Sequence, residues 1–316
     1  MFKRIYLLFI ICCCIQPAVH AQKTANQWYF GKNIGLNFNQ SPPQKLFNGN
    51  LSSIEGCASI ADANGNLLFY TNGVSVMTKN HTQMVNGDGI MGHLSSTNNA
   101  VIVPLPESDS IYYLFTVGAS GQLENGLKYT IINTRKQNGA GEVIEKNNIL
   151  HTNTYEKLAA VRHCNRKDVW ITVKDWNSDA YYTYLLTKNG VNPVPVISNM
   201  GTVIGVDPLN ALGTLKFSSD GKKLVAIHSF DNDAAQLMKF DNQTGVLSDP
   251  IWFRPNVVPG SDVYVGVYGA EFSPDNRLLY ISSRKINEEK SVLYQFDVSV
   301  HDEPTITNSK FVVATN

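Results

Sequence analysis

A short apolar strand, a polar turn and a second apolar strand recur along the chain, and this repeat limits the possible folds more than any other feature. The clearest copies are residues 215–227 and 270–281, whose turns read Ser-Ser-Asp-Gly and Ser-Pro-Asp-Asn. Asp-Gly and Asn-rich turns accept the positive φ that a tight hairpin reversal needs. Looser copies occupy residues 59–70, 101–115 and 160–171, so the sequence predicts five registered β-hairpins.

The spacing of these hairpins suits the blades of a propeller. With Ile60, Val103, Val161, Phe217 and Phe272 taken as equivalent, successive copies lie 43, 58, 56 and 55 residues apart. Such intervals accommodate four-stranded blades with loops of variable length. β-branched and aromatic residues fill the strand windows, and no helical window has a 3.6-residue apolar period. We therefore predict an all-β fold, a β-propeller of four-stranded blades, with a β-sandwich or β-helix as the competing architecture.

Further strands are expected outside the hairpins. They span residues 128–133, 180–186, 236–240 and 292–297. Five units are visible, so the termini either build a sixth blade or leave the ring incomplete. Because an open edge strand invites aggregation, the economical solution pairs residues 28–38 with the strand-like C-terminus near Phe311.

The first residues have the pattern of a secretory signal peptide. A basic pair precedes the apolar residues 5–15, and small residues end the segment at Ala21. This apolar run is too short for a membrane-spanning helix, which needs roughly 20 residues. We expect residues 1–21 to be a signal peptide and residues 22–316 to be one β-propeller domain. That domain is expected outside the cell, at its surface or in the periplasm, with no transmembrane segment after cleavage.

Composition and motifs exclude several classes of protein. Charged residues make up 16% of the chain and the formal net charge is zero, so no nucleic-acid partner is expected. Only Cys57 and Cys164 remain after the leader, and the register places them on different blades, so the fold is not a disulfide scaffold. No nucleophile elbow, glycine-rich phosphate loop or zinc-type histidine pair is present. We assign no catalytic residue, metal or cofactor.

Several runs of the mature chain resemble one known group of proteins. They are residues 26–38, 55–62, 68–73, 95–104, 156–163 and 268–275, among them NQWYFGKNIGLNF, EGCASIAD and YGAEFSPD. Together they resemble the propeller-like N-terminal region of large secreted Bacteroidetes surface proteins, which carry WD40-like or YVTN-like repeats. Those proteins are associated with gliding motility and type IX secretion. The resemblance implies a propeller at the cell surface and brings no catalytic residues.

The resemblance has two departures. Relatives usually continue with another hairpin unit and further domains, whereas this chain ends at Asn316 without a sorting domain. On this resemblance the chain is either truncated or closed by its own N-terminal strand.

The repeat register also locates a candidate site. In a propeller the innermost strand of each blade starts near one mouth of the central channel, where ligands commonly bind. Five residues before the reference positions stand Glu55, Asn98, Glu156, Leu212 and Val267. Our hypothesis is that Glu55, Asn98 and Glu156 bind a cation or a polar ligand such as a sugar. The alternative is that they accept hydrogen bonds from loop amides as caps.

One tryptophan is a further candidate for ligand binding. Trp176 lies in the polar loop of residues 175–179 and is the tryptophan that we suspect of being exposed, where it could stack on a sugar. A packing role at the edge of the core is the favoured interpretation.

Two functions are compatible with these features. The leading interpretation is a secreted or surface-exposed, non-enzymatic module that binds a protein or glycan partner or serves as a scaffold. The alternative is an extracellular propeller enzyme, lactonase-like or a glycan lyase or hydrolase, with Glu55 and Glu156 as the acid and base. Carboxylates grouped around a pocket would favour the enzyme, because the fold alone supplies no function.

Overall fold

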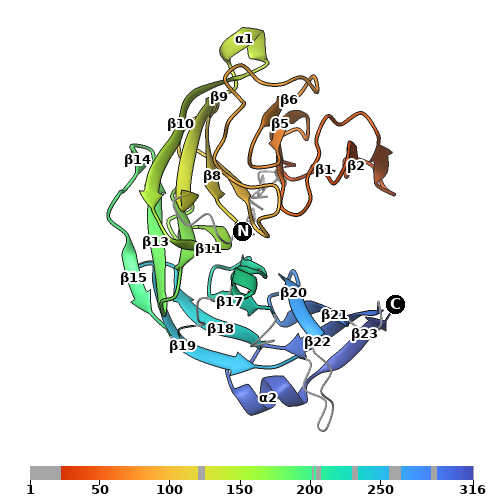
Figure 1. Ribbon diagram of the computed structural model, residues 1–316, viewed down its shortest axis with the longest axis vertical. Coiled ribbons are helices and arrows are strands. Elements are labelled where there is room, and N and C mark those ends of the chain that lie inside the picture. Colours follow the sequence, from red (N-terminus) through yellow and green to blue (C-terminus); the bar gives the residue numbers. More distant parts are fainter. Residues whose placement is uncertain are drawn as a thin grey trace, which may run out of the picture.

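Six antiparallel sheets follow one another along the chain and surround a common centre (Figure 1). The computed structural model describes residues 23–119, 125–200, 203, 208–229, 234–255, 265–285 and 290–315. The predicted signal peptide lies outside these residues. The protein is an all-β, six-bladed β-propeller with mostly four-stranded blades, so the predicted fold class is confirmed.

The first three sheets are formed from the N-terminal half of the chain. The first contains β1 (Gln27–Phe30), β2 (Ile34–Asn37) and β3 (Gln44–Leu46). The second contains β4 (Ala58–Ala61), β5 (Leu67–Thr71) and β6 (Val76–Thr78). The third contains β7 (Ala100–Pro104), β8 (Ile111–Val117), β9 (Leu127–Asn133) and β10 (Glu142–His151), with the short helix α1 (Lys136–Gly139) before β10.

The other three sheets follow in order. The fourth contains β11 (Thr154–Arg162), β12 (Val169–Asp175) and β13 (Ala180–Thr187), with β14 (Gly190–Val191) and β15 (Val196–Asn199) both paired to β13. The helical turn η2 (Pro208–Ala211) leads into the fifth sheet, which contains β16 (Leu215–Phe217), β17 (Lys223–His228), β18 (Ala234–Asp241) and β19 (Val246–Phe253). The sixth contains β20 (Val265–Phe272), β21 (Leu278–Lys285), β22 (Lys290–Asp297) and β23 (Phe311–Thr315), with α2 (Glu303–Asn308) before β23.

The repeat register is confirmed in five of these sheets. The five reference residues each lie on the first strand of the second to sixth sheets, namely β4, β7, β11, β16 and β20. The strands expected outside the hairpins are β9, β13, β18 and β22. Gly221 and Asn276 take φ values of 66° and 59° in the two clearest turns. The turn residues therefore have the conformation that their types favour.

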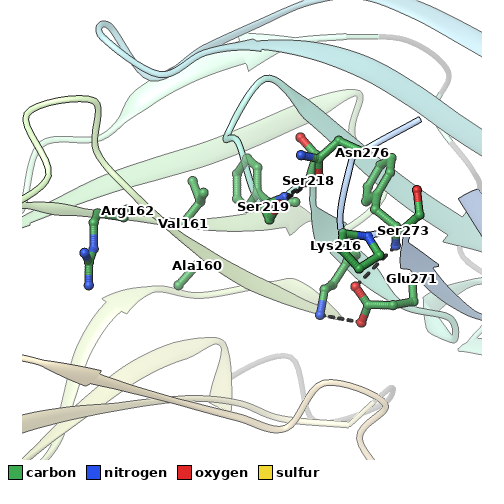
Figure 2. A pocket seen from close by; sticks show the side chains of 12 residues that line it. Ala160, Val161, Arg162, Lys216, Ser218, Ser219, Glu271, Ser273 and Asn276 are labelled. Atoms are coloured by element: carbon green, nitrogen blue, oxygen red, sulfur yellow. Dashed lines mark hydrogen bonds and ion pairs between the residues drawn. The ribbon is translucent and has the colours of Figure 1, made fainter. Parts of the chain in front are cut away.

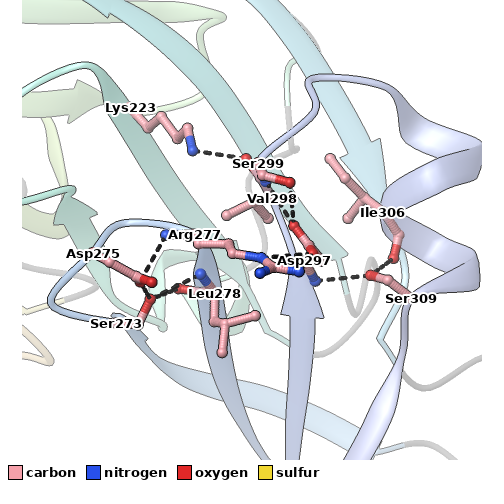
Figure 3. Close-up of polar contacts among 10 residues, drawn as sticks. All are labelled: Lys223, Ser273, Asp275, Arg277, Leu278, Asp297, Val298, Ser299, Ile306 and Ser309. Atoms are coloured by element: carbon pink, nitrogen blue, oxygen red, sulfur yellow. Dashed lines mark hydrogen bonds and ion pairs between the residues drawn. The ribbon is translucent and has the colours of Figure 1, made fainter.

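One serine in each of these two turns satisfies the backbone where the chain reverses. The Oγ of Ser218 accepts a hydrogen bond from the Lys223 amide at 2.9 Å, and that of Ser273 accepts one from the Leu278 amide at 2.8 Å. Lys223 then reaches from the fifth sheet to the carbonyl oxygen of Val298 in the sixth, 2.7 Å away (Figure 3). The hairpin ends are thus joined by polar contacts as well as by apolar packing.

Asp297 fixes the far end of the sixth sheet. Its carboxylate accepts hydrogen bonds from Ser299 and from the Arg277 guanidinium, which is 2.9 Å away (Figure 3). These hydrogen bonds, those from Ser299 first, lower the pKa of Asp297 to about 2. The Asp297 amide donates to Ser309 at 2.8 Å, which ties α2 to the end of β22.

Apolar side chains on alternate faces hold neighbouring sheets together. On β17, Leu224 and Ala226 pack toward the fourth sheet, whereas Val225 and Ile227 pack toward the sixth. This arrangement follows from the two-residue period of a strand, which sends successive side chains to opposite faces. Equivalent clusters join the first sheet to the second, the second to the third and the third to the fourth.

The predicted pairing of residues 28–38 with the C-terminal strand is wrong. β1 pairs with β2, with Trp28 opposite Leu36, and β23 pairs with β22. The N-terminal segment therefore builds a separate blade, the first sheet, which brings the five predicted units to six blades. Positive φ values at Gly31 and Asn33 close this hairpin locally. Local closure costs less loop entropy than pairing the two ends of the chain.

The first and sixth sheets are packed on one side only. Among the described residues, no hydrophobic cluster joins them, and they stand at the two ends of the circle of sheets in Figure 1. Trp28 on the first sheet is 49% exposed, and Phe311 on the sixth is 60% exposed. Apolar side chains are therefore exposed on these two faces, whereas the equivalent faces of the other sheets are covered by a neighbouring sheet.

We expect two tryptophans to differ sharply in their contribution to stability. Trp170 is 5% exposed and lies between the fourth and fifth sheets, whereas Trp28 is 49% exposed. The indole N–H groups of both tryptophans donate to backbone carbonyls. Trp170→Ala should lower the free energy of unfolding by about 3–5 kcal/mol, because it leaves a cavity. Trp28→Ala should cost only about 1 kcal/mol, close to a surface substitution. Urea unfolding of both variants measures this, and equal losses would show that another surface covers Trp28.

Candidate functional site

The three polar residues selected by the register lie close together at the start of the inner strands. Glu55 precedes β4, Asn98 precedes β7, and Glu156 is on β11. The Asn98 amide donates to the Glu156 carbonyl at 3.2 Å. The Asn98 side-chain oxygen accepts from the Leu215 amide at 2.9 Å, so this residue links the third, fourth and fifth sheets.

A chain of hydrogen bonds connects the two carboxylates. The Tyr268 hydroxyl donates to Glu55 Oε2 at 2.7 Å and lies 3.0 Å from Thr97 Oγ1. Glu156 Oε2 accepts from the Thr97 amide at 2.9 Å and from its hydroxyl at 3.2 Å. The Gly213 amide donates to the same hydroxyl at 3.3 Å. These five residues belong to the second through sixth sheets, so one network joins five of the six blades.

Burial makes this network part of the protein interior. Glu156 is 1% exposed and Glu55 is half-buried. Burial raises the pKa of Tyr268 well above its ordinary value, and the Glu55 carboxylate raises it further. Tyr268 therefore remains a hydrogen-bond donor at neutral pH. Glu156 accepts a hydrogen bond from the Thr97 backbone amide, as the capping alternative describes, whereas Glu55 accepts from the hydroxyls of Tyr268 and Ser95.

Trp176 packs at the edge of the core, which is the interpretation that the sequence favoured. Its ring is half-buried and lies 4.8 Å from the Tyr155 ring, at the edge of a small cluster that includes Ala211. The Trp176 amide donates to the Asn153 carbonyl at 2.6 Å, which turns the loop back toward the fourth sheet. Because this loop is held down, the ring packs against the core edge.

A cavity of about 470 Å³ lies at the opposite ends of the inner strands, where β11, β16 and β20 finish. Its lining comes from the fourth, fifth and sixth sheets and combines polar side chains with the apolar Ala160, Val161, Phe217, Phe272 and Pro274. Lys216 Nζ and Glu271 Oε2 form an ion pair at 2.7 Å, and their side chains point toward one another in Figure 2. The Asn276 side-chain oxygen accepts from the Ser219 amide at 2.8 Å and from its hydroxyl at 3.0 Å.

Arg162 contributes a free cation to this cavity. It ends β11, and its side chain is exposed. Its guanidinium has no ion pair and no hydrogen bond within the described part of the chain, and it lies apart from the Lys216–Glu271 pair (Figure 2). A guanidinium binds a carboxylate through two parallel hydrogen bonds. The cavity can therefore hold a polar ligand that carries a carboxylate.

The sequence analysis missed this cavity, although a signal for it was present. Lys216 and Glu271 stand one position before the reference residues Phe217 and Phe272. The same register that selected Glu55 and Glu156 would have placed the later pair side by side near the axis. We examined only the starts of the inner strands, and the cavity is at their ends.

Two further features limit the chemistry of the described residues. No cluster of three or more His, Cys, Asp or Glu side chains among them is arranged to hold a metal ion. Cys57 and Cys164 are free thiols, the first half-buried and the second exposed in the β11–β12 turn.

Comparisons with known proteins find similarity in architecture alone. No family model matches the chain, and no curated protein matches it. A protein of Lactobacillus plantarum is 12% identical, with 89% of this chain and 77% of that chain covered and a TM-score of 0.48. A putative 6-phosphogluconolactonase of Bacteroides fragilis is 11% identical, with 92% and 96% covered and a TM-score of 0.44. The periplasmic gluconolactonase of Pseudomonas aeruginosa is 11% identical, with 90% and 68% covered and a TM-score of 0.43. At these identities, none of them transfers an activity to this chain.

Proposed function

We propose that this protein is a secreted, non-enzymatic binding module for an acidic glycan. The ligand occupies the cavity at the ends of β11, β16 and β20, with its carboxylate on Arg162. The observation that carries the proposal is the Arg162 guanidinium, which has no ion pair among the described residues and lines a cavity of about 470 Å³. The predicted signal peptide supports a place outside the cytoplasm, where such glycans occur.

The lining supports a glycan over other acidic ligands. The Lys216–Glu271 pair offers both donors and acceptors, and Ser219 and Asn276 add a hydroxyl and an amide. Sugar hydroxyl groups both donate and accept hydrogen bonds, so they need partners of both kinds. Phe217 and Phe272 also line the cavity, so the apolar face of a sugar ring would have partners there as well as its hydroxyls. A uronic acid fits this pattern, because its carboxylate pairs with arginine and its hydroxyls meet the remaining groups.

The geometry of the predicted mouth favours a binding module over an enzyme. A general acid and base must reach the substrate with free oxygens. Here Glu156 Oε2 is bonded to Thr97 and Glu55 Oε2 to Tyr268, and the Tyr268 and Thr97 hydroxyls lie between the two carboxylates. These contacts hold both carboxylates to other groups of the fold.

A role at or outside the cell envelope remains part of this proposal. No helix among the described residues is long and apolar enough to cross a membrane. The resemblance to secreted surface modules agrees with such a location. Fluorescence microscopy of the protein labelled at Cys164 in its native host would test the location.

Removing the Arg162 guanidinium should abolish most of the glycan binding. The expected loss of affinity of Arg162→Ala for oligogalacturonate is about tenfold or more, because a charge-assisted bidentate contact disappears. Isothermal titration measures it, with Arg254→Ala as a control at an exposed arginine outside the cavity. Equal binding of a neutral galactan, or unchanged affinity in Arg162→Ala, would contradict the proposal. Preferential binding of acidic peptides would identify a protein ligand instead of a glycan.

Glu156→Gln separates a structural role from a catalytic one. The substitution removes the charged acceptor for Thr97 and should lower the free energy of unfolding by about 1.5–3 kcal/mol. Glycan binding at the other end of the strands should be unchanged. Urea unfolding and titration measure the two effects. The enzyme alternative would be established if the wild-type protein turned over a lactone or a glycan and Glu156→Gln lost this turnover while its stability stayed unaltered.

A further inference from the structure

Two lysines are buried side by side in the fourth sheet, away from the cavity described above. Lys157 on β11 is fully buried and Lys174 on β12 is 1% exposed. Both ammonium groups lie 5.6 Å from the centre of the Tyr155 ring, and that of Lys174 is 4.9 Å from the Tyr181 ring. Two cations therefore share one aromatic environment inside the protein.

Within the described part of the chain, neither ammonium has a carboxylate partner at ion-pair distance. Lys157 Nζ donates to the carbonyls of Ala211 and Leu212, both at 2.7 Å. Lys174 Nζ donates to the Ser178 carbonyl at 2.6 Å. Carbonyl oxygens orient an ammonium group but do not neutralise it. Burying a charge without a counter-ion is costly, and proteins generally pair such charges.

The nearest acidic groups are engaged elsewhere. Glu156 is bonded to Thr97 on the side of the strand that faces the third sheet. Asp175 lies 2.7 Å from His151. Asp179 and Asp175 raise the pKa of Lys174, but they offset only part of the lowering that burial causes. Burial is the larger effect, and it lowers the pKa of Lys157 to about 7 and that of Lys174 to about 8.

His228 adds a second, independent sign of a missing partner. It ends β17 in the neighbouring fifth sheet, is fully buried, and stacks on Trp252 with ring centroids 5.1 Å apart. Neither ring nitrogen has a hydrogen bond of standard geometry among the described residues, although the Gln236 side chain is close enough to raise its pKa slightly. Burial, and then the nearby Lys157 and Lys174, lower the pKa of His228 well below its usual range. The Gln236 amide is already bonded to Tyr181 and Met200, so at least one nitrogen of the neutral imidazole has no partner among the described residues, whereas buried polar groups are generally bonded.

We propose that Lys157, Lys174 and His228 form a binding site for a small carboxylate between the fourth and fifth sheets. The ammonium groups supply the charge, and the His228 N–H supplies a directed donor. Trp176 and Trp252 pack against the same cluster as Tyr155, so the ligand's apolar body meets aromatic rings. An aromatic or otherwise apolar monocarboxylate fits better than phosphate, whose second charge would face these rings. The site is independent of the glycan cavity and does not use Arg162.

The two lysines also predict how stability changes with pH. The unfolded chain holds protons on them up to their ordinary pKa of 10.5, and the folded chain releases them near 7 and 8. The unfolded state therefore binds more protons, and the free energy of unfolding should rise as the pH increases from 7 to 9. Urea midpoints across this range measure the slope. Lys174→Met should flatten it, whereas Lys239→Met at an exposed ion pair should not.

Benzoate, acetate and inorganic phosphate are the probes for the site itself. Benzoate should raise the melting temperature, change tryptophan fluorescence and shift the ring signals of His228 in NMR spectra. Acetate should have a weaker effect and phosphate little effect. Affinity should fall as the pH rises from 7 to 9, because the bound carboxylate requires protonated lysine.

Variants show whether this response arises at the proposed residues. Lys174→Met should weaken benzoate binding about tenfold or more, Lys174→Arg should retain it, and Arg162→Ala should leave it unchanged. The charge-retaining arginine variant guards against a simple folding defect. The proposal is overturned if benzoate binds Lys174→Met as well as the wild-type protein. It is equally overturned if no probe shifts the His228 signals, whereas loss of glycan binding alone would affect only the proposed function.

Discussion

The Tyr268 hydroxyl, held between Glu55 and Thr97, is the contact on which the arrangement of the inner strands depends. Through Thr97 and Glu156, it connects residues that belong to five different sheets. Apolar clusters fasten each sheet to its neighbours along the chain, and among the described residues this network and Asn98 add polar links between the starts of the inner strands. Because buried polar groups demand partners, this network fixes how the strands approach one another at their starting ends.

The same fold treats polar groups in three different ways. At the starting ends of the inner strands, carboxylates are buried and bonded, so they contribute to structure. At the finishing ends, Arg162 is exposed and has no ion pair among the described residues, which is why we propose it as the ligand's partner. Between the fourth and fifth sheets, two lysines are buried with no carboxylate at ion-pair distance in the described part of the chain, and a buried charge of this kind is costly. Burial and pairing, and not residue type, distinguish these three groups of charges.

Much of the fold was predictable because it depends on local chemistry. The hairpin turns carry residues that tolerate positive φ, as Gly221 and Asn276 show. On β17, successive apolar side chains point to opposite faces, and both faces are covered by neighbouring sheets. The order of the sheets follows the order of these hairpins. The pairing of residues 28–38 could not be predicted in this way. Two apolar strands at opposite ends of a chain look complementary, whereas the choice between local and distant pairing depends on loop entropy.

The sequence by itself determined the hairpin register, the turn conformations and the convergence of Glu55, Asn98 and Glu156 on one end of the inner strands. Only the tertiary structure decided what these side chains do. Tyr268 and Glu55 are 213 positions apart, and no periodicity links them. Whether a carboxylate is free or bonded, and whether Arg162 or Lys174 finds a partner, depends on how the six sheets are rotated around the centre. A strand's period specifies which face a side chain occupies, but packing alone decides what it meets there.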